Sequence, residues 1–110
     1  MDSCPVHYAL TVLNGKWKLR IVWVLQHEKI IRFNELRRQL DGISNLMLSR
    51  NLQELEQDHI VIRKQYNEVP PRVEYSLSEL GREISPALEL LGQWGERAHL
   101  VNANNERSLT

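Results

Sequence analysis

The chain has 110 residues, of which 42% are hydrophobic and 25% charged, and its 14 Lys and Arg are balanced by 14 Asp and Glu. This ordinary globular composition excludes a disordered chain, a collagen-like repeat and a disulfide scaffold, and the zero net charge excludes a uniformly basic surface. A single cysteine can form no disulfide within the chain. The longest apolar run, residues 21–25, is much shorter than a membrane span, and no signal peptide is visible, so we expect a soluble cytoplasmic protein without a membrane segment.

The zero net charge hides an uneven distribution. Residues 14–64 carry ten Lys or Arg and six Asp or Glu, whereas residues 65–110 carry four basic and seven acidic residues. This distribution is typical of a chain that turns one face toward a polyanion and keeps another face away from it. Chance clustering of charges is the alternative.

The first two predicted elements are helices. A helix over residues 5–13 begins with proline, whose missing N–H has no partner at a first helical position, and Asn14-Gly15 ends it. Residues 17–26 are apolar nearly all round, which is typical of a buried central helix. A β-strand over residues 21–25 is the alternative, and the length of the segment favours the helix.

A strand and a helix pair come next. Residues 30–32 are predicted as a short strand, and the following helix has Phe33, Leu36 and Leu40 on one face. After a tight turn, Ser44 is a favourable N-cap for a second helix that runs to about residue 58, because its hydroxyl can accept from an unpaired N–H. The spacing i, i+4, i+7 gives that helix a buried stripe of Leu48, Leu52 and Leu55.

A β-hairpin is predicted after the helix pair. Residues 60–65 and 72–77 form its strands, and the second strand alternates apolar and polar residues as a half-buried strand does. Pro70 and Pro71 require a loop between the strands.

The last predicted element is a helical region from the cap Ser78 to about Asn104. Pro86 is expected to kink or interrupt it. The polar end over residues 105–110 is predicted to be frayed. The apolar stripe of this region consists of Leu80, Ile84, Leu88, Leu91 and Trp94.

A helix pair followed directly by a hairpin has the element order of a winged helix-turn-helix, so we predict a mainly α-helical fold with a small β-hairpin (α+β). The major groove of DNA admits one helix, and base contacts come from the N-terminal part of the second helix of the pair. There Asn and Gln pair with adenine, Arg pairs with guanine, and apolar side chains contact the thymine methyl group. Leu46 points away from the predicted core, so it either contacts DNA or is a tolerated exposed leucine. The candidate base-reading residues are Asn45, Leu46, Met47, Ser49, Arg50 and Gln53.

Phosphate contacts position a DNA-binding protein without reading sequence. Asn34 and Arg38 on the first helix of the pair are candidates for such contacts. Lys64 and Arg72 flank the hairpin tip, and Arg72 is a candidate for the adjacent minor groove. The alternative for each of these residues is a solvated surface position.

The chain resembles the HxlR-type family of bacterial winged-helix transcription regulators, which are relatives of the MarR-type regulators. The resemblance covers the chain from Cys4 to about Ala98. It rests on Cys4-Pro5, Gly15-Lys16-Trp17, residues 32–36, Gly42-Ile43-Ser44, Met47-Leu48, residues 52–56, residues 70–77 with Gly81, and Trp94-Gly95.

The resemblance implies a homodimer that binds double-stranded DNA at a pseudo-palindromic operator and represses or activates a neighbouring gene. It implies recognition by residues 44–53, Ser44 included, and a wing contact by Arg72. His59 departs from the family's pattern, which has glycine where the backbone is often left-handed, and this departure puts the end of the preceding helix in doubt. The implied layout is a single domain over residues 1–110, with dimerisation helices over 5–28 and 79–104, a helix-turn-helix over 33–58 and a wing over 60–77.

The one cysteine, Cys4, lies at the predicted start of the first helix, where the helix dipole makes a thiol more reactive. In some members of the family an N-terminal cysteine in a Cys-Pro context senses oxidants or electrophiles. The resemblance therefore implies a redox switch, in which modification of Cys4 changes the angle between the two DNA-binding heads. An inert, half-buried cysteine is the alternative.

We expect no enzyme activity, no metal and no cofactor. The four histidines, at positions 7, 27, 59 and 99, lack the spacing of a helical metal site, and neither a Gly-rich phosphate loop nor a nucleophile motif is present. Two other functions stay open. One is a winged helix used only for protein contacts, which would show no salt-dependent DNA binding. The other is a regulator gated by a small apolar molecule held between the last helices and the DNA-binding core.

Overall fold

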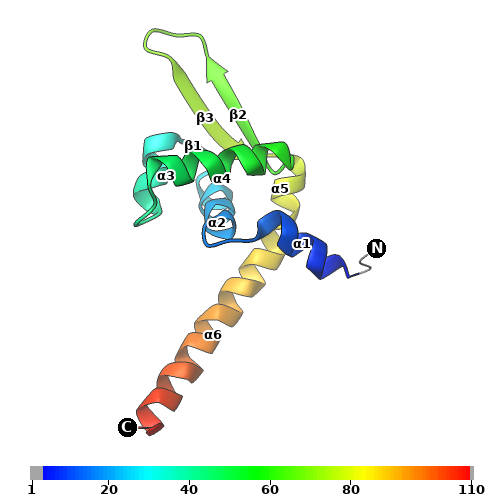
Figure 1. The fold of residues 1–110 in the computed structure, drawn as a ribbon, viewed down its shortest axis with the longest axis vertical. Helices are drawn as coiled ribbons and strands as arrows, with labels where there is room; N and C mark the ends of the chain where they lie inside the picture. The colour runs from blue at the N-terminus through cyan, green and yellow to red at the C-terminus, as the bar shows by residue number, and fades with distance from the viewer. Residues whose placement is uncertain (1–3, 110) are drawn as a thin grey trace.

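The computed structural model describes the backbone of residues 4–109 and the side chains of residues 4–105. It is mainly α-helical with one small antiparallel sheet, which confirms the predicted α+β class and the winged helix-turn-helix order of elements (Figure 1). The elements are α1 (Pro5–Leu13), α2 (Lys18–Glu28), β1 (Ile30–Arg32), α3 (Phe33–Gln39), α4 (Asn45–Gln57), β2 (Val61–Tyr66), β3 (Arg72–Leu77), α5 (Glu79–Glu83) and α6 (Ser85–Leu109).

The centre of the molecule is α2, which packs against α3, α4, the sheet and the start of α6. Ile21 and Val22 are completely buried in it, and Leu25 is nearly so. The helix prediction for this segment is therefore confirmed, and the alternative of a strand is wrong. An apolar surface on nearly every side suits a helix that other elements surround.

The helix pair α3–α4 buries the residues that its periodicity predicts. Leu36 on α3, and Leu48 and Leu55 on α4, have no exposed surface. Gly42 has a φ of 90° in the turn between the helices, a conformation that glycine adopts without steric cost. The Ser44 hydroxyl accepts a hydrogen bond from the Met47 N–H at 3.1 Å, so the predicted N-cap is confirmed.

The sheet has the strand order β1-β3-β2, with both pairs antiparallel. Because side chains alternate between the two faces of a strand, the register divides the hairpin residues into two sets. Arg63 pairs with Tyr75 and Gln65 pairs with Val73, so these four side chains share one face. The opposite face carries the pairs Ile62 with Ser76, Lys64 with Glu74, and Tyr66 with Arg72.

The end of α4 has the left-handed residue that the family pattern implies. His59 has a φ of 63°, which costs a residue with a Cβ atom about 1 kcal/mol relative to glycine. The Ser78 hydroxyl fastens this corner, because it donates to the His59 carbonyl at 2.6 Å and accepts from the Gly81 N–H at 2.9 Å. The position that departs from the family's pattern therefore keeps the backbone geometry of that pattern.

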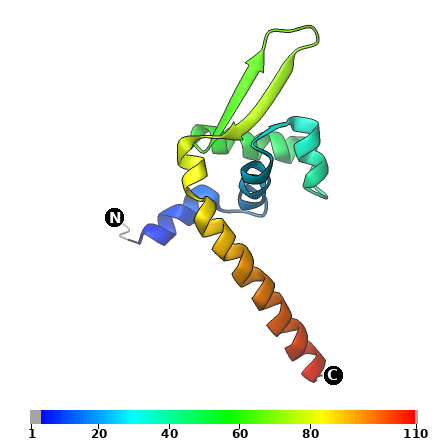
Figure 2. The same ribbon diagram turned by 180° about the vertical axis from the view of Figure 1, so that it is seen from behind.

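The last helical region is interrupted as Pro86 predicts. Helix α5 ends at Glu83 and α6 begins at Ser85, since a proline near the start of a helix needs no N–H partner. Helix α6 then continues to Leu109, so the structure has helical backbone beyond Asn104, over residues predicted to be frayed; Thr110 lies outside the described residues. Both views show α6 projecting away from the rest of the fold (Figures 1 and 2).

Candidate nucleic-acid interface

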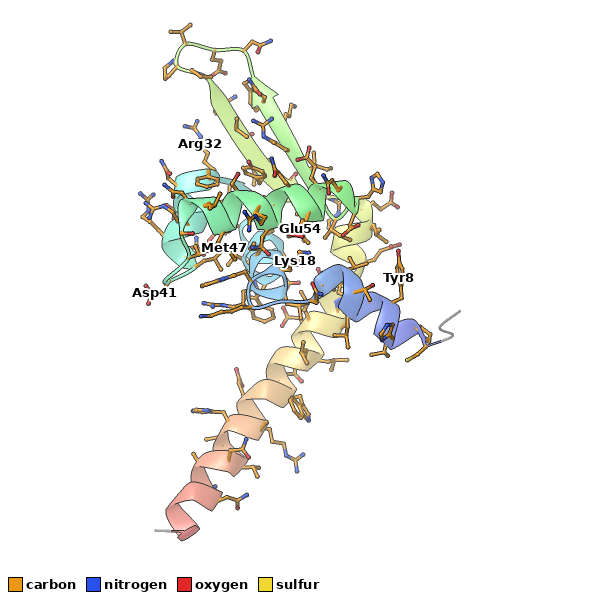
Figure 3. The ribbon with its side chains drawn as sticks, viewed as in Figure 1. Tyr8, Lys18, Arg32, Asp41, Met47 and Glu54 are labelled. Atoms are coloured by element: carbon orange, nitrogen blue, oxygen red, sulfur yellow. The ribbon has the colours of Figure 1, made fainter. Side chains whose placement is uncertain are left out.

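Helix α4, the predicted recognition helix, turns its candidate base-reading residues toward solvent. Leu46 is 66% exposed and Met47 is 38% exposed, and both lie in the first turn of the helix. Figure 3 labels Met47 on α4. The N-cap Ser44 precedes them, and Asn45, Ser49, Arg50 and Gln53 are also exposed. The helix therefore presents amides, a guanidinium and two apolar side chains on a surface that stays exposed within the described part of the chain.

Buried leucines of α4 hold the helix against the core, and an ion pair joins it to α2. The side chain of Lys18, on α2, is 8% exposed, and its Nζ lies 3.7 Å from Glu54 Oε1 on α4 (Figure 3). Asn51 is also buried, and it donates from Nδ2 to the Met47 carbonyl at 2.8 Å within α4 itself. Sequence analysis missed both residues, because a lysine and an asparagine carry no sign that packing will enclose them.

On α3, the predicted phosphate contacts Asn34 and Arg38 are both exposed. Arg38 donates from Nε to Glu35 Oε2 at 3.1 Å. Hydrogen bonding by Arg38, followed by its charge, holds the pKa of Glu35 below the usual value for a glutamate. An exposed pair of this kind contributes little to stability, so Arg38 can exchange it for a phosphate at small cost.

The two predicted wing residues lie on the same face of the hairpin, and their surroundings differ. Arg72 has a side chain only 29% exposed; its Nη2 lies 3.1 Å from Glu68 Oε1 and its Nε 3.8 Å from Glu74 Oε2. The guanidinium also stacks 4.0 Å from the centre of the Tyr66 ring. Arg72 is therefore held within the wing by two carboxylates and an aromatic ring. Lys64 is exposed, with its Nζ 5.0 Å from the same ring.

A groove of about 520 Å³ lies where α4 packs beside the hairpin. Its walls include Ser49, Gln53 and Glu56 from α4 and Arg63 from β2. Two predicted base-reading residues thus share a groove with an arginine that sequence analysis did not select. The signal was available in the alternation of the strand, but the pairing register was needed to tell which face adjoins α4.

Cys4 is the N-cap residue of α1, as predicted, and its side chain is exposed. The helix that it begins also exposes Val6, Tyr8 and Leu10, at 66%, 71% and 55%. An apolar surface of this kind on a short helix is typical of a contact with another chain.

Among residues 4–109, none of the helices combines the length and hydropathy that a membrane span requires. In the same part of the chain, no three His, Cys, Asp or Glu residues come together in a way that would hold a metal ion.

The comparisons with known proteins agree with this geometry. The family described as HxlR-like helix-turn-helix matches residues 12–102. The HTH-type transcriptional regulator BH0655 of Halalkalibacterium halodurans is 45% identical over 105 residues, which cover 96% of this chain and 89% of that protein. YtcD of Bacillus subtilis, also an HTH-type transcriptional regulator, is 46% identical over 93 residues, covering 84% and 73% of the two chains.

Solved structures are similar over almost the whole chain. The redox regulator HypR in its reduced form superposes with a TM-score of 0.85 at 42% identity, covering 92% of this chain and 99% of that one. The reduced form of the transcriptional regulator YodB from B. subtilis gives a TM-score of 0.75 at 32% identity, covering 87% and 94%.

Proposed function

The chain belongs to the HxlR-like helix-turn-helix family, a family of transcriptional regulators rather than enzymes, and we propose that it binds a pseudo-palindromic DNA operator as a homodimer. The observation that carries the proposal is the exposed N-terminal half of α4, on a helix that buried contacts hold in place. In this proposal α4 enters the major groove, where Asn45, Arg50 and Gln53 donate to or accept from base edges. Leu46 and Met47 contact thymine methyl groups. In this proposal the protein acts in the cytoplasm, the compartment that holds the DNA of a bacterium.

Unpartnered apolar side chains on α1 and α6 support the homodimer. Leu90, Leu91, Trp94 and Val101 are 67%, 49%, 67% and 48% exposed, and about 100° per residue brings them to one side of α6. Contiguous exposed apolar surface on a small protein marks a contact with a partner. The proposed dimer surface consists of α1 and α6 without α2, since the apolar side of α2 is used in the core.

Selection of random duplex DNA by the purified, reduced protein at about physiological salt tests the proposal. We expect enrichment of a pseudo-palindrome with half-site centres about 34 Å apart, one turn of DNA, because a two-fold axis relates the recognition helices. The affinity for the selected site should fall as salt rises. If no sequence is enriched and binding is weak even at low salt, the winged helix is a protein-interaction module or needs an effector.

A hollow in the structure favours testing the second function, a regulator that needs a small-molecule effector. An open hollow of about 360 Å³ lies between α2 and α6, and Trp23, Leu88 and Leu91 line it. This is the position that the alternative of a ligand-gated regulator assigns to its small apolar molecule. Repeating the selection with added apolar compounds separates a regulator that needs a ligand from a protein-interaction module.

We further propose that Cys4 is an oxidant-sensitive switch. The exposed thiol at the start of α1 supports this proposal, and so do the similar structures of HypR in oxidised and reduced forms and of YodB after diamide treatment. The chain has one cysteine, so a disulfide must join Cys4 of two subunits or join Cys4 to a small thiol. Two thiols then lose two protons and two electrons, which the N=N bond of diamide takes up as its hydrazine form.

Mild diamide treatment should therefore convert Cys4 to a disulfide and change the affinity for the selected operator. Mass spectrometry under non-reducing conditions identifies the product, and dithiothreitol should restore the original affinity. A Cys4→Ser variant, which lacks the thiol, should bind the operator equally well with and without diamide. An unmodified Cys4 together with unchanged affinity in the original protein would contradict the switch.

A further inference from the structure

The hairpin presents different charged groups on its two faces, and only one face adjoins the recognition helix. Arg63 lies on the face that carries Tyr75 and Val73, and all three line the groove beside α4. Lys64 and Arg72 lie on the opposite face. Arg63 is therefore the charged side chain that the wing presents on the face next to α4.

The geometry of duplex DNA indicates which part of the DNA would lie in this groove of the protein. Neighbouring major and minor grooves are separated by one sugar-phosphate strand. If α4 enters the major groove and the hairpin reaches the adjacent minor groove, that strand passes between α4 and β2. We propose, on the basis of the function above, that Arg63 binds a phosphate of this strand and that Arg63, rather than Arg72, is the principal backbone contact of the wing.

The charges around Arg63 suit this role. Its Nη1 donates to Gln65 Oε1 at 3.3 Å, and a neutral amide leaves the positive charge in place. No carboxylate among the described side chains forms an ion pair with it, whereas Arg72 already lies between two carboxylates. Arginine binds phosphate through two parallel N–H groups, which suits a fixed position at the side of a groove.

Glu56 is the acidic residue in the same groove, and its effect should be opposite. A carboxylate repels a phosphate, so it restricts the strand to the side of the groove that Arg63 occupies. The two residues therefore give predictions of opposite sign, which a general loss of folding cannot imitate.

The test measures the affinity of the full chain for its selected operator at several salt concentrations. Arg63→Gln should weaken binding about tenfold per half-site, as expected for the loss of one charge-assisted hydrogen bond. The slope of log K against log salt should fall by about 0.9 per half-site, because one phosphate contact is lost. Arg63→Lys keeps the charge and should keep most of the slope, and Glu56→Gln should strengthen binding.

The matched control is Lys64→Gln, which removes the same charge from the opposite face of the same strand. We expect a smaller change in slope for it, and no change in the preferred sequence for any of these variants. An Arg63→Gln variant with unchanged slope, or a Lys64→Gln variant with an equal loss, would overturn the assignment while the original protein still binds its operator. If the original protein selects no operator, the proposed function itself fails.

Discussion

Replacing Gly81 by alanine is expected to destabilise the protein by about 3 kcal/mol, because a methyl group has no room at this position. The added Cβ would lie 2.3 Å from the Ile60 carbonyl oxygen and 3.2 Å from Leu77 Cδ2. The Ile60 carbonyl cannot move away freely, since it accepts the Ser78 N–H at 2.9 Å. Thermal unfolding followed by circular dichroism should show a Tm lower by roughly 10–15 °C.

Gly95→Ala is the matched control for this substitution. It adds the same methyl group in α6, where no atom of another element lies within 4 Å of the new Cβ among the described residues. Alanine favours a helix interior over glycine by roughly 0.5–1 kcal/mol, so the Tm should rise slightly. If Gly81→Ala unfolds at the temperature of the original protein, then α5 does not approach the start of β2 as closely as the structure has it.

Replacing Trp94 by glutamate is expected to convert the homodimer to a monomer and to abolish operator binding. Trp94 is 67% exposed at the centre of the apolar side of α6, and buried tryptophans contribute most to many interfaces. A carboxylate in place of the Trp94 ring would lose its water in the dimer interface without gaining a charged partner. Sedimentation equilibrium should give the 12.9 kDa mass of one chain instead of twice that value.

His99→Glu is the control for the introduced charge. It makes the same change in net charge, with His neutral, on the same helix, five residues and therefore about 140° away from Trp94. This variant should stay dimeric and should bind the operator. A dimeric Trp94→Glu variant would contradict the proposed interface, and a monomeric variant that keeps full operator affinity would contradict the need for a dimer.

The sequence predicted most of the elements because their patterns are local. The stripe Leu48, Leu52 and Leu55 has helical spacing, and the caps Ser44 and Ser78 mark helix starts that depend on one hydroxyl each. The family resemblance, too, rests on short segments of the chain, and the match over residues 12–102 confirms it. These features need no knowledge of which elements touch.

The side chains between elements were harder to predict. Nothing in the sequence around Lys18 distinguishes it from a surface lysine. Its side chain is enclosed beside Glu54 only because α4 packs against α2. In the sequence, Arg72 stands where an arginine at the tip of a wing would be available to DNA. In the structure its guanidinium instead contacts Glu68, Glu74 and Tyr66. The contact of Lys18 with Glu54 and those of Arg72 with Glu68 and Tyr66 join residues that periodicity leaves unrelated.

By itself, the sequence determined the order of elements of a winged helix-turn-helix, because local periodicity, capping and turn residues fix that order. Its resemblance to the HxlR-type family, which the family match confirms, indicated a transcriptional regulator. The tertiary structure decided which charges are available to a ligand. The strand register placed Arg63 beside the recognition helix and Lys64 on the opposite face, although the two are neighbours in the chain. Alternation along a strand separates such neighbours, but only packing against α4 determines which face is the inner one.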